Sequence, residues 1–344
     1  MRTLTLLILC ALANLCAAAG EGQFRIYWID VEGGAATLMV TPAGESILVD
    51  TGNPGVRDAN RIVRVATQEA NLRKIDHLIT THYHRDHFGG AALLSTLLPV
   101  GTVYDNGEFE NMPDNPGKEY FGFACDRRVV LQPNDELQLK QHSGSPAVAI
   151  RCLGARQQFV SPGASDPRNT NVCAECVEKD RDGSDNANSI VTLISFGNFR
   201  FFDGGDLTWN QEMKLVCPNN LIGQVDVYQV THHGLDSSNN PVVLKTIQPT
   251  VAIMNNGETK GCLPEVFANL RGTASIKHIY QMHKNLRPDG EVNNTDDHLI
   301  ANHEGAKECK GEFILLTVAA DSSSYSVSVP SQGTTNSYDT RPKS

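Results

Sequence analysis

Four residues of the types that commonly bind metal ions stand close together in the sequence THYHRDH at residues 81–87. They are His82, His84, Asp86 and His87. Neutral imidazole and carboxylate groups suit zinc-like divalent ions, and a catalytic zinc site keeps one position open for water or substrate. A lone histidine is usually a structural or surface residue, but this spacing on one tight loop indicates a catalytic metal site.

Two further motifs place polar side chains directly after apolar segments. Asp206 follows residues 199–203 and two glycines, which allow the backbone to turn sharply towards a metal site. A carboxylate in this position could bridge two cations held about 3.5–4 Å apart. His232 and His233 follow the expected strand at residues 225–231. Polar groups at successive strand ends commonly assemble one site in α/β proteins, so we expect these residues to meet the histidine loop.

The three motifs together resemble the metallo-β-lactamase superfamily. Their elements are HxHxDH at residues 82–87, Asp206 in GGD, and His-His-Gly at residues 232–234. Asp50 in LVDTG resembles the first motif of this family, whose aspartate steadies the histidine loop. The resemblance extends over residues 29–239 and implies an α/β fold, the αββα sandwich, in which helices flank two mixed β-sheets.

Finer features resemble one branch of that superfamily, the hydrolase domain of DNA-uptake competence proteins and their secreted relatives. The segments concerned are IDVEGGAATLMV, ILVDTG, NANSIVTLISFGNFRFFDGGDL and VDVYQVTHHG. These relatives usually have Gln-Gly-Asp where this chain has Glu-Gly-Gly-Ala at residues 32–35. Many superfamily members also have a histidine where this chain has Asp-Asn-Ala-Asn-Ser at residues 185–189. Competence-type domains carry asparagine there, which implies that Asn186 or Asn188 takes that place, directly or through water.

The resemblance implies a site for two divalent metal ions, with Zn²⁺ expected and Mn²⁺ as the alternative. The expected ligands are His82, His84, Asp86, His87, Asp206 and His233, with Asn186 or Asn188 at the remaining position. An amide oxygen is a weaker zinc ligand than imidazole, so that position favours a harder ion.

The implied reaction is hydrolysis by a hydroxide held at the metal ions, which lower the pKa of water towards about 7. Asp206 would bridge the ions. Asp86 would hold the ion that polarises the substrate, and His232 would donate a proton to the leaving group or stabilise its charge.

Phosphodiester hydrolysis is the favoured function, because the competence-type features and Asp206 point to it. True β-lactamases of this fold generally lack an aspartate at the position of Asp206. Hydrolysis of lactones, β-lactams or other acyl substrates is the first alternative. The second is an extracellular metal-binding protein with weak or no catalysis, because the histidine of the third motif is missing.

The charge balance bears on binding partners. The chain has 29 basic and 39 acidic residues and a formal net charge of −10. Stable nucleic-acid complexes normally require clustered lysine and arginine, so we expect none. The expected partner is a small-molecule or phosphodiester substrate, and the sequence does not indicate the number of subunits.

The N-terminus predicts a signal peptide over residues 1–19. Arg2 supplies positive charge, residues 4–15 are almost entirely apolar, and residues 17–19 are alanines that suit cleavage. A membrane span needs about 20 apolar residues, more than this run provides, and no later segment is long enough. We therefore expect a secreted or periplasmic protein with no membrane span.

The remaining chain predicts one hydrolase domain over residues 20–330 and a disordered tail over residues 331–344. The expected strands are residues 24–30, 36–40, 46–50, 75–80, 147–153, 189–196, 199–203, 225–231, 251–255, 313–319 and 325–329. The expected helices are residues 60–72, 90–98 and 241–247. Residues 105–126 are expected to form a surface insertion near the site.

Cysteines and one further histidine complete the candidates. Nine cysteines include two in the predicted signal peptide, and in an oxidising compartment some of the other seven should form disulfides. Cys173 and Cys176 form a CxxC motif without a second pair, which favours a structural disulfide or free thiols over a zinc site. His283 is the single candidate for a substrate contact outside the three motifs.

The signal peptide generates the first testable prediction. N-terminal sequencing of the exported protein should find a chain that begins close to Gly20. An exported protein that retains residues 1–19 would contradict this prediction.

Overall fold

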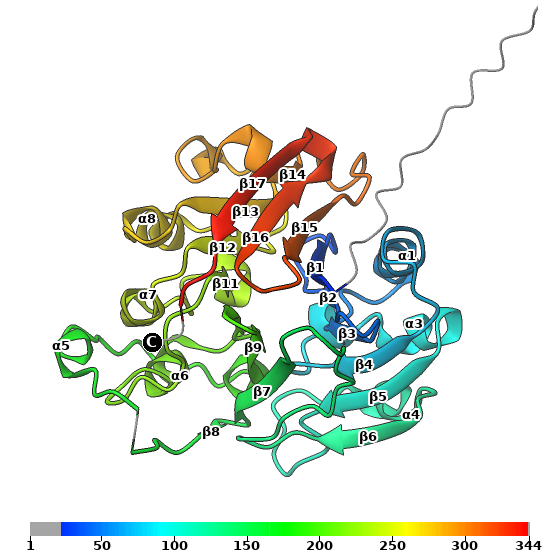
Figure 1. Cartoon of the computed structure of the whole chain (residues 1–344), viewed down its shortest axis with the longest axis horizontal. Coiled ribbons are helices and arrows are strands. Elements are labelled where there is room, and N and C mark those ends of the chain that lie inside the picture. Colours follow the sequence, from blue (N-terminus) through cyan, green and yellow to red (C-terminus); the bar gives the residue numbers. More distant parts are fainter. Residues whose placement is uncertain (1–21, 165, 343–344) are drawn as a thin grey trace, which may run out of the picture.

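The computed structural model describes residues 22–164 and 166–342, which form two large β-sheets packed face to face (Figure 1). The first sheet has the strand order β17-β16-β15-β1-β2-β3-β4-β5-β6. Its strands are β1 Phe24–Ile29, β2 Thr37–Val40, β3 Ser46–Val49, β4 Ile75–Ile79, β5 Val100–Asp105, β6 Arg127–Val130, β15 Phe313–Val318, β16 Ser324–Val329 and β17 Thr334–Asp339.

The second sheet has the strand order β14-β13-β12-β11-β10-β9-β7-β8. Its strands are β7 Val148–Ala155, β8 Gln158–Phe159, β9 Val191–Phe196, β10 Phe199–Asp203, β11 Val227–Gln229, β12 Val251–Met254, β13 His278–His283 and β14 Ile300–Asn302. Both sheets contain parallel and antiparallel pairs.

Helices cover the outer face of each sheet (Figure 1). Those on the first sheet are α1 Val56–Arg64, α2 Arg85–Phe88, α3 Ala91–Leu97 and α4 Gly117–Gly122. Those on the second sheet are α5 Thr170–Cys173, α6 Trp209–Lys214, α7 Pro241–Ile247 and α8 Pro264–Gly272. The predicted αββα sandwich is therefore confirmed.

Strand β1 shows why the sandwich has three apolar layers. Successive side chains of a strand point to opposite faces of the sheet. Phe24, Ile26 and Trp28 pack between the two sheets, whereas Tyr27 and Ile29 pack on the side of the helices. Because both faces are covered, the strand is apolar along almost its whole length.

Parallel pairing decides where the polar motifs meet. Strand β3 pairs in parallel with β4, and β10, β11 and β12 form a second parallel set. The carboxyl ends of parallel strands lie at one edge of a sheet, where open α/β sheets place their ligand sites. Asp50 follows β3, the histidine loop follows β4, Asp206 follows β10, and His232 follows β11.

The structure extends the sequence predictions in several places. The expected helix at residues 60–72 begins earlier, as α1, and continues into a π-helical turn, η1 (Val65–Glu69). The expected strands all appear, but β5, β6, β8, β13, β14 and β17 were not predicted. Strand β13 was missed because its sequence HIYQMH has a histidine at each end, although it is almost wholly buried between β12 and β14.

The prediction of a disordered tail is wrong for Thr334–Asp339. These residues form β17, which pairs in antiparallel fashion with β16 at the edge of the first sheet. Thr335, Ser337 and Asp339 face outwards, whereas Tyr338 is only 4% exposed. Its hydroxyl lies 2.8 Å from Tyr280 Oη and 2.7 Å from His278 Nδ1. The composition of the tail indicated disorder because most of its residues are polar, and one buried tyrosine hardly changes that composition.

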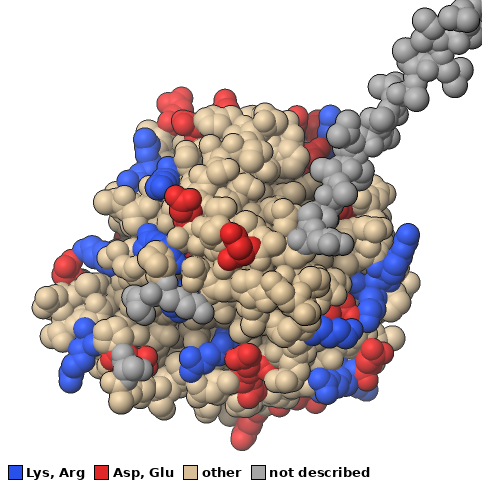
Figure 2. Space-filling model, viewed as in Figure 1, with Lys and Arg blue, Asp and Glu red and all other residues tan. Residues whose placement is uncertain are grey.

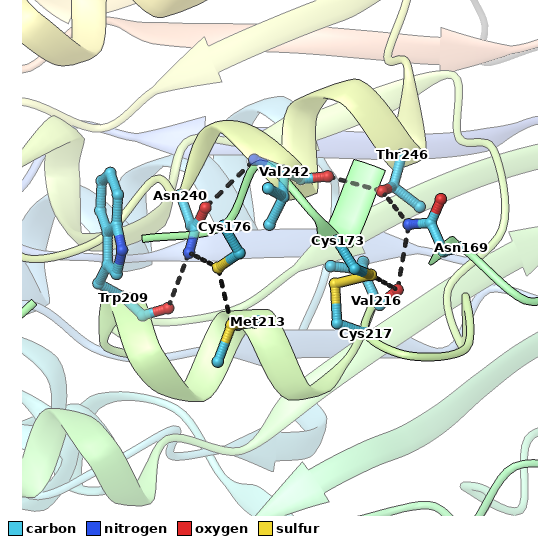
Figure 3. The surroundings of a disulfide bond; sticks show 10 residues. All are labelled: Asn169, Cys173, Cys176, Trp209, Met213, Val216, Cys217, Asn240, Val242 and Thr246. Carbon is cyan, nitrogen blue, oxygen red and sulfur yellow. Dashed lines mark hydrogen bonds between the residues drawn. A yellow bond between two sulfur atoms is a disulfide. The ribbon is translucent and has the colours of Figure 1, made fainter. Parts of the chain in front are cut away.

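One disulfide is present among the described residues, between Cys173 and Cys217 (Figure 3). Cys176, the other cysteine of the CxxC motif, remains a thiol, and Asn240 Nδ2 lies 3.6 Å from its Sγ. The disulfide closes a loop across 44 sequence positions and ties α5 to the segment after α6. One cysteine of the motif, Cys173, thus forms a structural disulfide, and the other, Cys176, is a free thiol.

Two expectations concern the membrane. Among the described residues, no helix is both long enough and apolar enough to cross a bilayer. The predicted signal peptide, residues 1–19, lies outside the described residues.

The role of β17 can be tested by substitution. Tyr338→Ala should lower the free energy of unfolding by about 3 kcal/mol, because it removes a buried aromatic ring and leaves a cavity. Tyr338→Phe should cost about 1 kcal/mol through loss of the hydrogen bonds. The exposed neighbour provides the control, since Asp339→Ala should change the value by less than about 0.5 kcal/mol. Chemical denaturation measures the free energy of unfolding of all three variants. An unchanged denaturation midpoint for Tyr338→Ala would contradict a stabilising role of β17 and support the predicted disordered tail.

Candidate metal centre

Asp50 holds the histidine loop in place through its contacts with Thr81 and His87. Its Oδ1 accepts a hydrogen bond of 2.8 Å from the Thr81 backbone N–H, and its Oδ2 accepts one of 2.7 Å from Thr81 Oγ1. The same Oδ2 lies 2.7 Å from Nδ1 of His87. These contacts match the steadying role that the family resemblance implies for Asp50. Such outer partners fix the orientation of a ligating histidine and raise its basicity.

The imidazoles are oriented so that their Nε2 atoms face the interior of the site. Nδ1 of His87 donates to Asp50, and Nδ1 of His233 donates to the Asn255 carbonyl oxygen over 3.2 Å. Nδ1 of His82 lies 3.1 Å from Thr81 Oγ1, whose own proton goes to Asp50. Because Nδ1 carries the proton in each ring, Nε2 presents its lone pair inwards.

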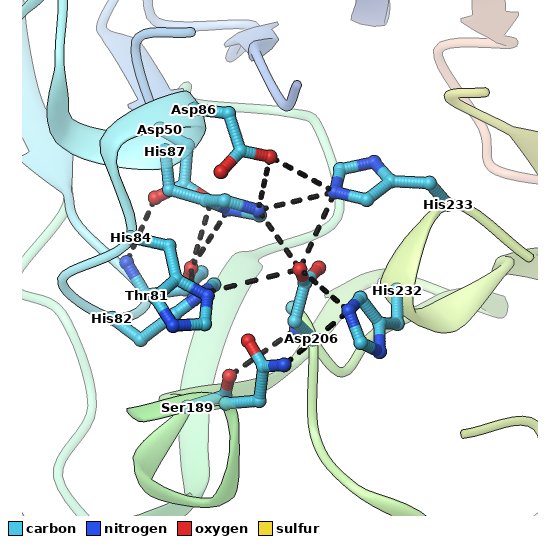
Figure 4. A network of polar contacts seen from close by, with 12 residues as sticks. Asp50, Thr81, His82, His84, Asp86, His87, Ser189, Asp206, His232 and His233 are labelled. Carbon is cyan, nitrogen blue, oxygen red and sulfur yellow. Dashed lines mark hydrogen bonds and ion pairs between the residues drawn. The ribbon is translucent and has the colours of Figure 1, made fainter. Parts of the chain in front are cut away.

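Asp206 occupies the centre of these rings (Figure 4). Its Oδ2 lies 3.1 Å from Nε2 of His87 and 3.3 Å from Nε2 of His233. Nε2 of His232 is 3.6 Å away and that of His82 is 3.9 Å away. One carboxylate oxygen therefore lies within 4 Å of four imidazole nitrogens that come from distant parts of the chain.

At this site two groups of side chains could each hold a metal ion, and both include Asp206. They are Asp86, His87, Asp206 and His233 in one group, and His82, His84 and Asp206 in the other. The structure thus brings together all six residues that the sequence predicted as principal ligands. His84 is the most open histidine of the set, and its Nε2 lies 3.3 Å from Asp114 Oδ2. Asp114 belongs to the insertion at residues 105–126, which does reach the site.

Unusual backbone conformations position the second and third motifs. Gly205 has φ +56°, and a Cβ there would lie only 3.1 Å from the Thr81 Cβ. His232 and His233 both have φ +55°, a region that residues with side chains rarely adopt. Two hydrogen bonds hold this conformation. The His232 backbone N–H donates to the Gly205 carbonyl oxygen over 3.0 Å, and Asn239 Nδ2 donates to the Thr231 carbonyl oxygen over 2.9 Å.

Burial and mutual charge shift the titration of the site. Burial raises the pKa of Asp206, but the neighbouring His233, His87 and His232 outweigh it and hold that pKa well below its usual range. Burial lowers the pKa of His87, but Asp206, Asp50 and Asp86 raise it well above its usual value. The carboxylates therefore require positive charge beside them, which protonated histidines or divalent cations can provide.

His232 differs from the other histidines in its titration. Burial lowers its pKa to about 4, so the ring is neutral at neutral pH. Its Nδ1 lies 3.0 Å from Ser237 Oγ and 3.1 Å from Ser238 Oγ, and its Nε2 lies 3.3 Å from Asn186 Nδ2.

The two candidate asparagines are not equivalent. Asn186 lies beside His232, and its buried Oδ1 has no hydrogen-bond partner. The polar atoms of Asn188 are used elsewhere, because Nδ2 donates to Asp185 Oδ1 over 2.8 Å and Oδ1 accepts from Gln157 Nε2 over 3.1 Å. Asn186 is therefore the better placed of the two.

The expectation that His283 contacts substrate is wrong. Its side chain is fully buried, and Nε2 lies 2.6 Å from Asp30 Oδ1. Arg61 Nη1 lies 2.7 Å from Asp30 Oδ2 and 2.9 Å from Glu32 Oε1, so a guanidinium group already neutralises these carboxylates. His283 sits within a buried ion-pair network, at a strand end that its sequence did not reveal.

This network supports the loop that touches Asp86. The backbone N–H of Ala35 donates to the Asp86 carbonyl oxygen over 3.1 Å, and a Cβ on Gly34 would lie 2.4 Å from that oxygen. Only glycine permits this approach. The segment Glu32-Gly33-Gly34-Ala35 thus has a packing role here.

Sequence reasoning missed one charged residue at the site. Lys260 Nζ forms an ion pair with Asp86 Oδ2. The signal that could have found it is the glycine-rich run at residues 256–261, which follows β12 just as the other motifs follow their strands.

Comparison with known proteins agrees with this geometry. Residues 29–150 match the family described as the Metallo-beta-lactamase superfamily. Recombination protein 2 of Haemophilus influenzae is 27% identical over 256 residues, which cover 73% of this chain and 26% of that protein. A UPF0173 metal-dependent hydrolase of Cupriavidus taiwanensis is 32% identical over 125 residues, or 31% of this chain and 40% of that protein. ComE operon protein 3 of Bacillus subtilis is 25% identical over 190 residues, or 54% of this chain and 20% of that protein.

These matches confirm the resemblance inferred from the motifs, including its competence-type branch, and they support a metal-dependent hydrolase. The chain spans about a quarter of the length of Recombination protein 2 and less than half of the UPF0173 protein.

A buried carboxyl group behind the His232–His233 loop makes the stability of the protein pH-dependent. Glu212 Oε2 accepts a hydrogen bond of 2.8 Å from the Asn240 backbone N–H, whereas Oε1 has no partner. Burial raises the pKa of Glu212 to about 8, from an ordinary value of 4.5. Between these values the folded protein holds a proton that the unfolded chain releases, so stability falls as pH rises from about 4.5 to about 8.

Glu212→Gln should remove this pH dependence, because glutamine cannot ionise. Its melting temperature relative to wild type should rise by about 2 °C or more between pH 5 and pH 9. The half-exposed Glu265 of α8 provides the control, and Glu265→Gln should track the wild type at every pH. A difference in melting temperature between Glu212→Gln and wild type that stays constant with pH would refute the raised pKa of Glu212.

Proposed function

Because this chain carries a metallo-β-lactamase domain, we propose that it is a hydrolase with two divalent metal ions that cleaves phosphodiesters. His82, His84 and Asn186 would hold one ion, and Asp86, His87 and His233 the other. Asp206 would bridge them.

The position of Asp206 Oδ2 is the observation that carries this proposal. The atom lies within 4 Å of Nε2 atoms from both ligand groups, 3.9 Å from His82 on one side and 3.1 Å and 3.3 Å from His87 and His233 on the other. A carboxylate shared in this way is what a two-metal site requires. The bridging aspartate also weighs against a β-lactamase.

The donor set fits divalent metal ions. Nε2 of His82 is buried without a hydrogen-bond partner, and so is Oδ1 of Asn186. Buried polar atoms are rarely left unpaired in proteins, and each such atom indicates a missing ligand or a functional role. Imidazole nitrogens favour Zn²⁺, whereas the amide oxygen of Asn186 leaves Mn²⁺ as the alternative at one position. When bound, such ions supply Lewis acidity and lower the pKa of water towards about 7.

His232 is assigned to proton transfer. It is neutral at neutral pH because burial lowers its pKa to about 4. Asn186 Nδ2 is a donor, so Nε2 of the neutral ring is the acceptor in that contact and carries no proton for a leaving group. In place of the proton donation expected from the sequence, Nε2 of His232 would take up the proton released as water attacks. Ser237 and Ser238 would hold the ring through Nδ1. Asp86 remains ionised, since His87, His233 and Lys260 outweigh burial and lower its pKa below the usual range.

The place of action and the partners form part of the proposal. The disulfide Cys173–Cys217 is of a type that persists in oxidising compartments, which supports secretion or a periplasmic location. Basic and acidic side chains are interspersed on the face shown in Figure 2. On the formal net charge of −10, we propose a small phosphodiester substrate without a stable nucleic-acid complex.

Asp206→Asn tests the two-metal assignment. The substitution keeps the size of the side chain but removes the charge that offsets two nearby cations, so one ion should be lost first. Wild-type protein purified without chelator should contain more than one equivalent of zinc or manganese. Turnover of bis(4-nitrophenyl) phosphate should fall on the order of a hundredfold or more in the variant.

The control for burial is Asp226→Asn. Asp226 is a buried aspartate at the start of β11 that accepts hydrogen bonds from the Arg200 and Arg341 backbone N–H groups. This control should lower the melting temperature and leave the metal content unchanged. Full metal content and normal turnover in Asp206→Asn would overturn the bridging assignment. Wild-type turnover of 4-nitrophenyl acetate or a β-lactam, without phosphodiester turnover, would favour the acyl-hydrolase alternative.

A further inference from the structure

Lys260 is the lysine that reaches the candidate metal centre. Its Nζ forms an ion pair with Asp86 Oδ2, and its side chain remains 38% exposed. Among the described residues, no other lysine or arginine forms an ion pair with Asp86 or Asp206. The charged group therefore lies both against the site and towards solvent.

The loop that carries Lys260 is fixed against the loop that carries His233. The backbone N–H of Cys262 donates to the His233 carbonyl oxygen over 3.0 Å. Gly261 has φ +76°, and a Cβ there would lie 2.0 Å from that same oxygen, so only glycine fits. Arg287 clamps the other side, since its Nη1 donates to the carbonyl oxygens of Thr259 and Gly261 over 2.9 Å and 2.7 Å. Hydrogen bonds thus hold the backbone on both sides of Lys260, while its side chain is partly exposed.

The ammonium group competes with a metal ion for one oxygen. Asp86 Oδ2 also lies 3.4 Å from Nε2 of His233 and 3.6 Å from Nε2 of His87, so it belongs to a metal-ligand group. A divalent ion on Asp86 would repel a neighbouring ammonium group strongly at low dielectric constant. The lysine stem has four flexible carbons, so Nζ can swing away from Asp86 while its backbone stays fixed.

The charge balance then favours an anionic ligand. The carboxylates of Asp86 and Asp206 cannot neutralise two divalent ions, and Lys260 adds a further positive charge. An anion that bridges the metal ions and the ammonium group would satisfy all three. Lysine commonly binds phosphate oxygens as a compact point charge.

We propose that Lys260 is a specificity-determining residue that binds the negatively charged oxygen of the substrate and selects anionic phosphodiesters over neutral esters. This inference rests on the proposed function for its two metal ions. It adds a substrate contact that the three motifs do not contain.

Binding of dimethyl phosphate, a monoanionic diester, tests this role without turnover. Isothermal titration calorimetry on the zinc-loaded full chain should show affinity about tenfold or more weaker for Lys260→Met than for wild type. Lys260→Arg should retain part of the affinity, and metal content should be equal in all three proteins. Lys245→Met is the matched control, because Lys245 is an exposed lysine of α7 paired with Glu175.

Turnover provides the second readout. For Lys260→Met, kcat/KM should fall for bis(4-nitrophenyl) phosphate, mainly through KM, and should change little for neutral 4-nitrophenyl acetate. Equal losses on both substrates, unchanged dimethyl phosphate affinity, loss of metal from the variant, or no dimethyl phosphate binding by wild type would each overturn the role of Lys260. Lysine-dependent binding of dimethyl phosphate by a metal-loaded protein that hydrolyses neither substrate would refute the proposed function and leave the assignment of Lys260 standing.

Discussion

The carboxylate of Asp206 is buried in the protein, and an uncompensated charge in such a place costs several kcal/mol. His87 and His233, whose pKa values Asp206 raises, lie 3.1 Å and 3.3 Å from one of its oxygens and offset this charge, as would the metal ions that we propose. Each ring must point inwards, which explains the second layer of partners, such as Asp50 for His87 and the Asn255 carbonyl oxygen for His233. The demand for positive charge around Asp206 thus organises the histidine loop, the GGD turn and the left-handed His232–His233 pair.

Glycines let the loops approach closely enough to meet that demand. Gly34 lies against the Asp86 carbonyl oxygen, Gly205 against Thr81, and Gly261 against the His233 carbonyl oxygen. A side chain at any of these positions would push a ligand-bearing loop out of place. The buried pair of Asp30 and Arg61 then anchors the first of these loops to the sandwich. Close backbone contacts therefore hold the loops around the centre, and the Lys260 side chain on one of them remains 38% exposed.

Two features of the centre bear on its chemistry, one through metal affinity and the other through charge. Asn186 replaces the imidazole that the resemblance leads one to expect, and this weakens one position for zinc. Lys260 adds a positive charge next to the other position. In the centre that we propose, they would give unequal metal positions and an excess of positive charge, which would suit anionic substrates better than neutral ones.

The sequence by itself determined eleven of the strands and the six principal ligand candidates, because these depend on local patterns, and the αββα class followed from the resemblance that the motifs carry. The ligands of the HxHxDH loop are neighbours in the chain, and Asp206 and His233 each follow a recognisable strand. Tertiary structure alone decided which asparagine contacts His232 and that His283 pairs with Asp30. It also brought Lys260 to Asp86, which lies 174 positions away in the sequence. It also decided that Tyr338 anchors a final strand in what reads as a polar tail. The physical reason is the same in each case: a long-range contact between single side chains leaves no periodicity, spacing or composition that the sequence could reveal.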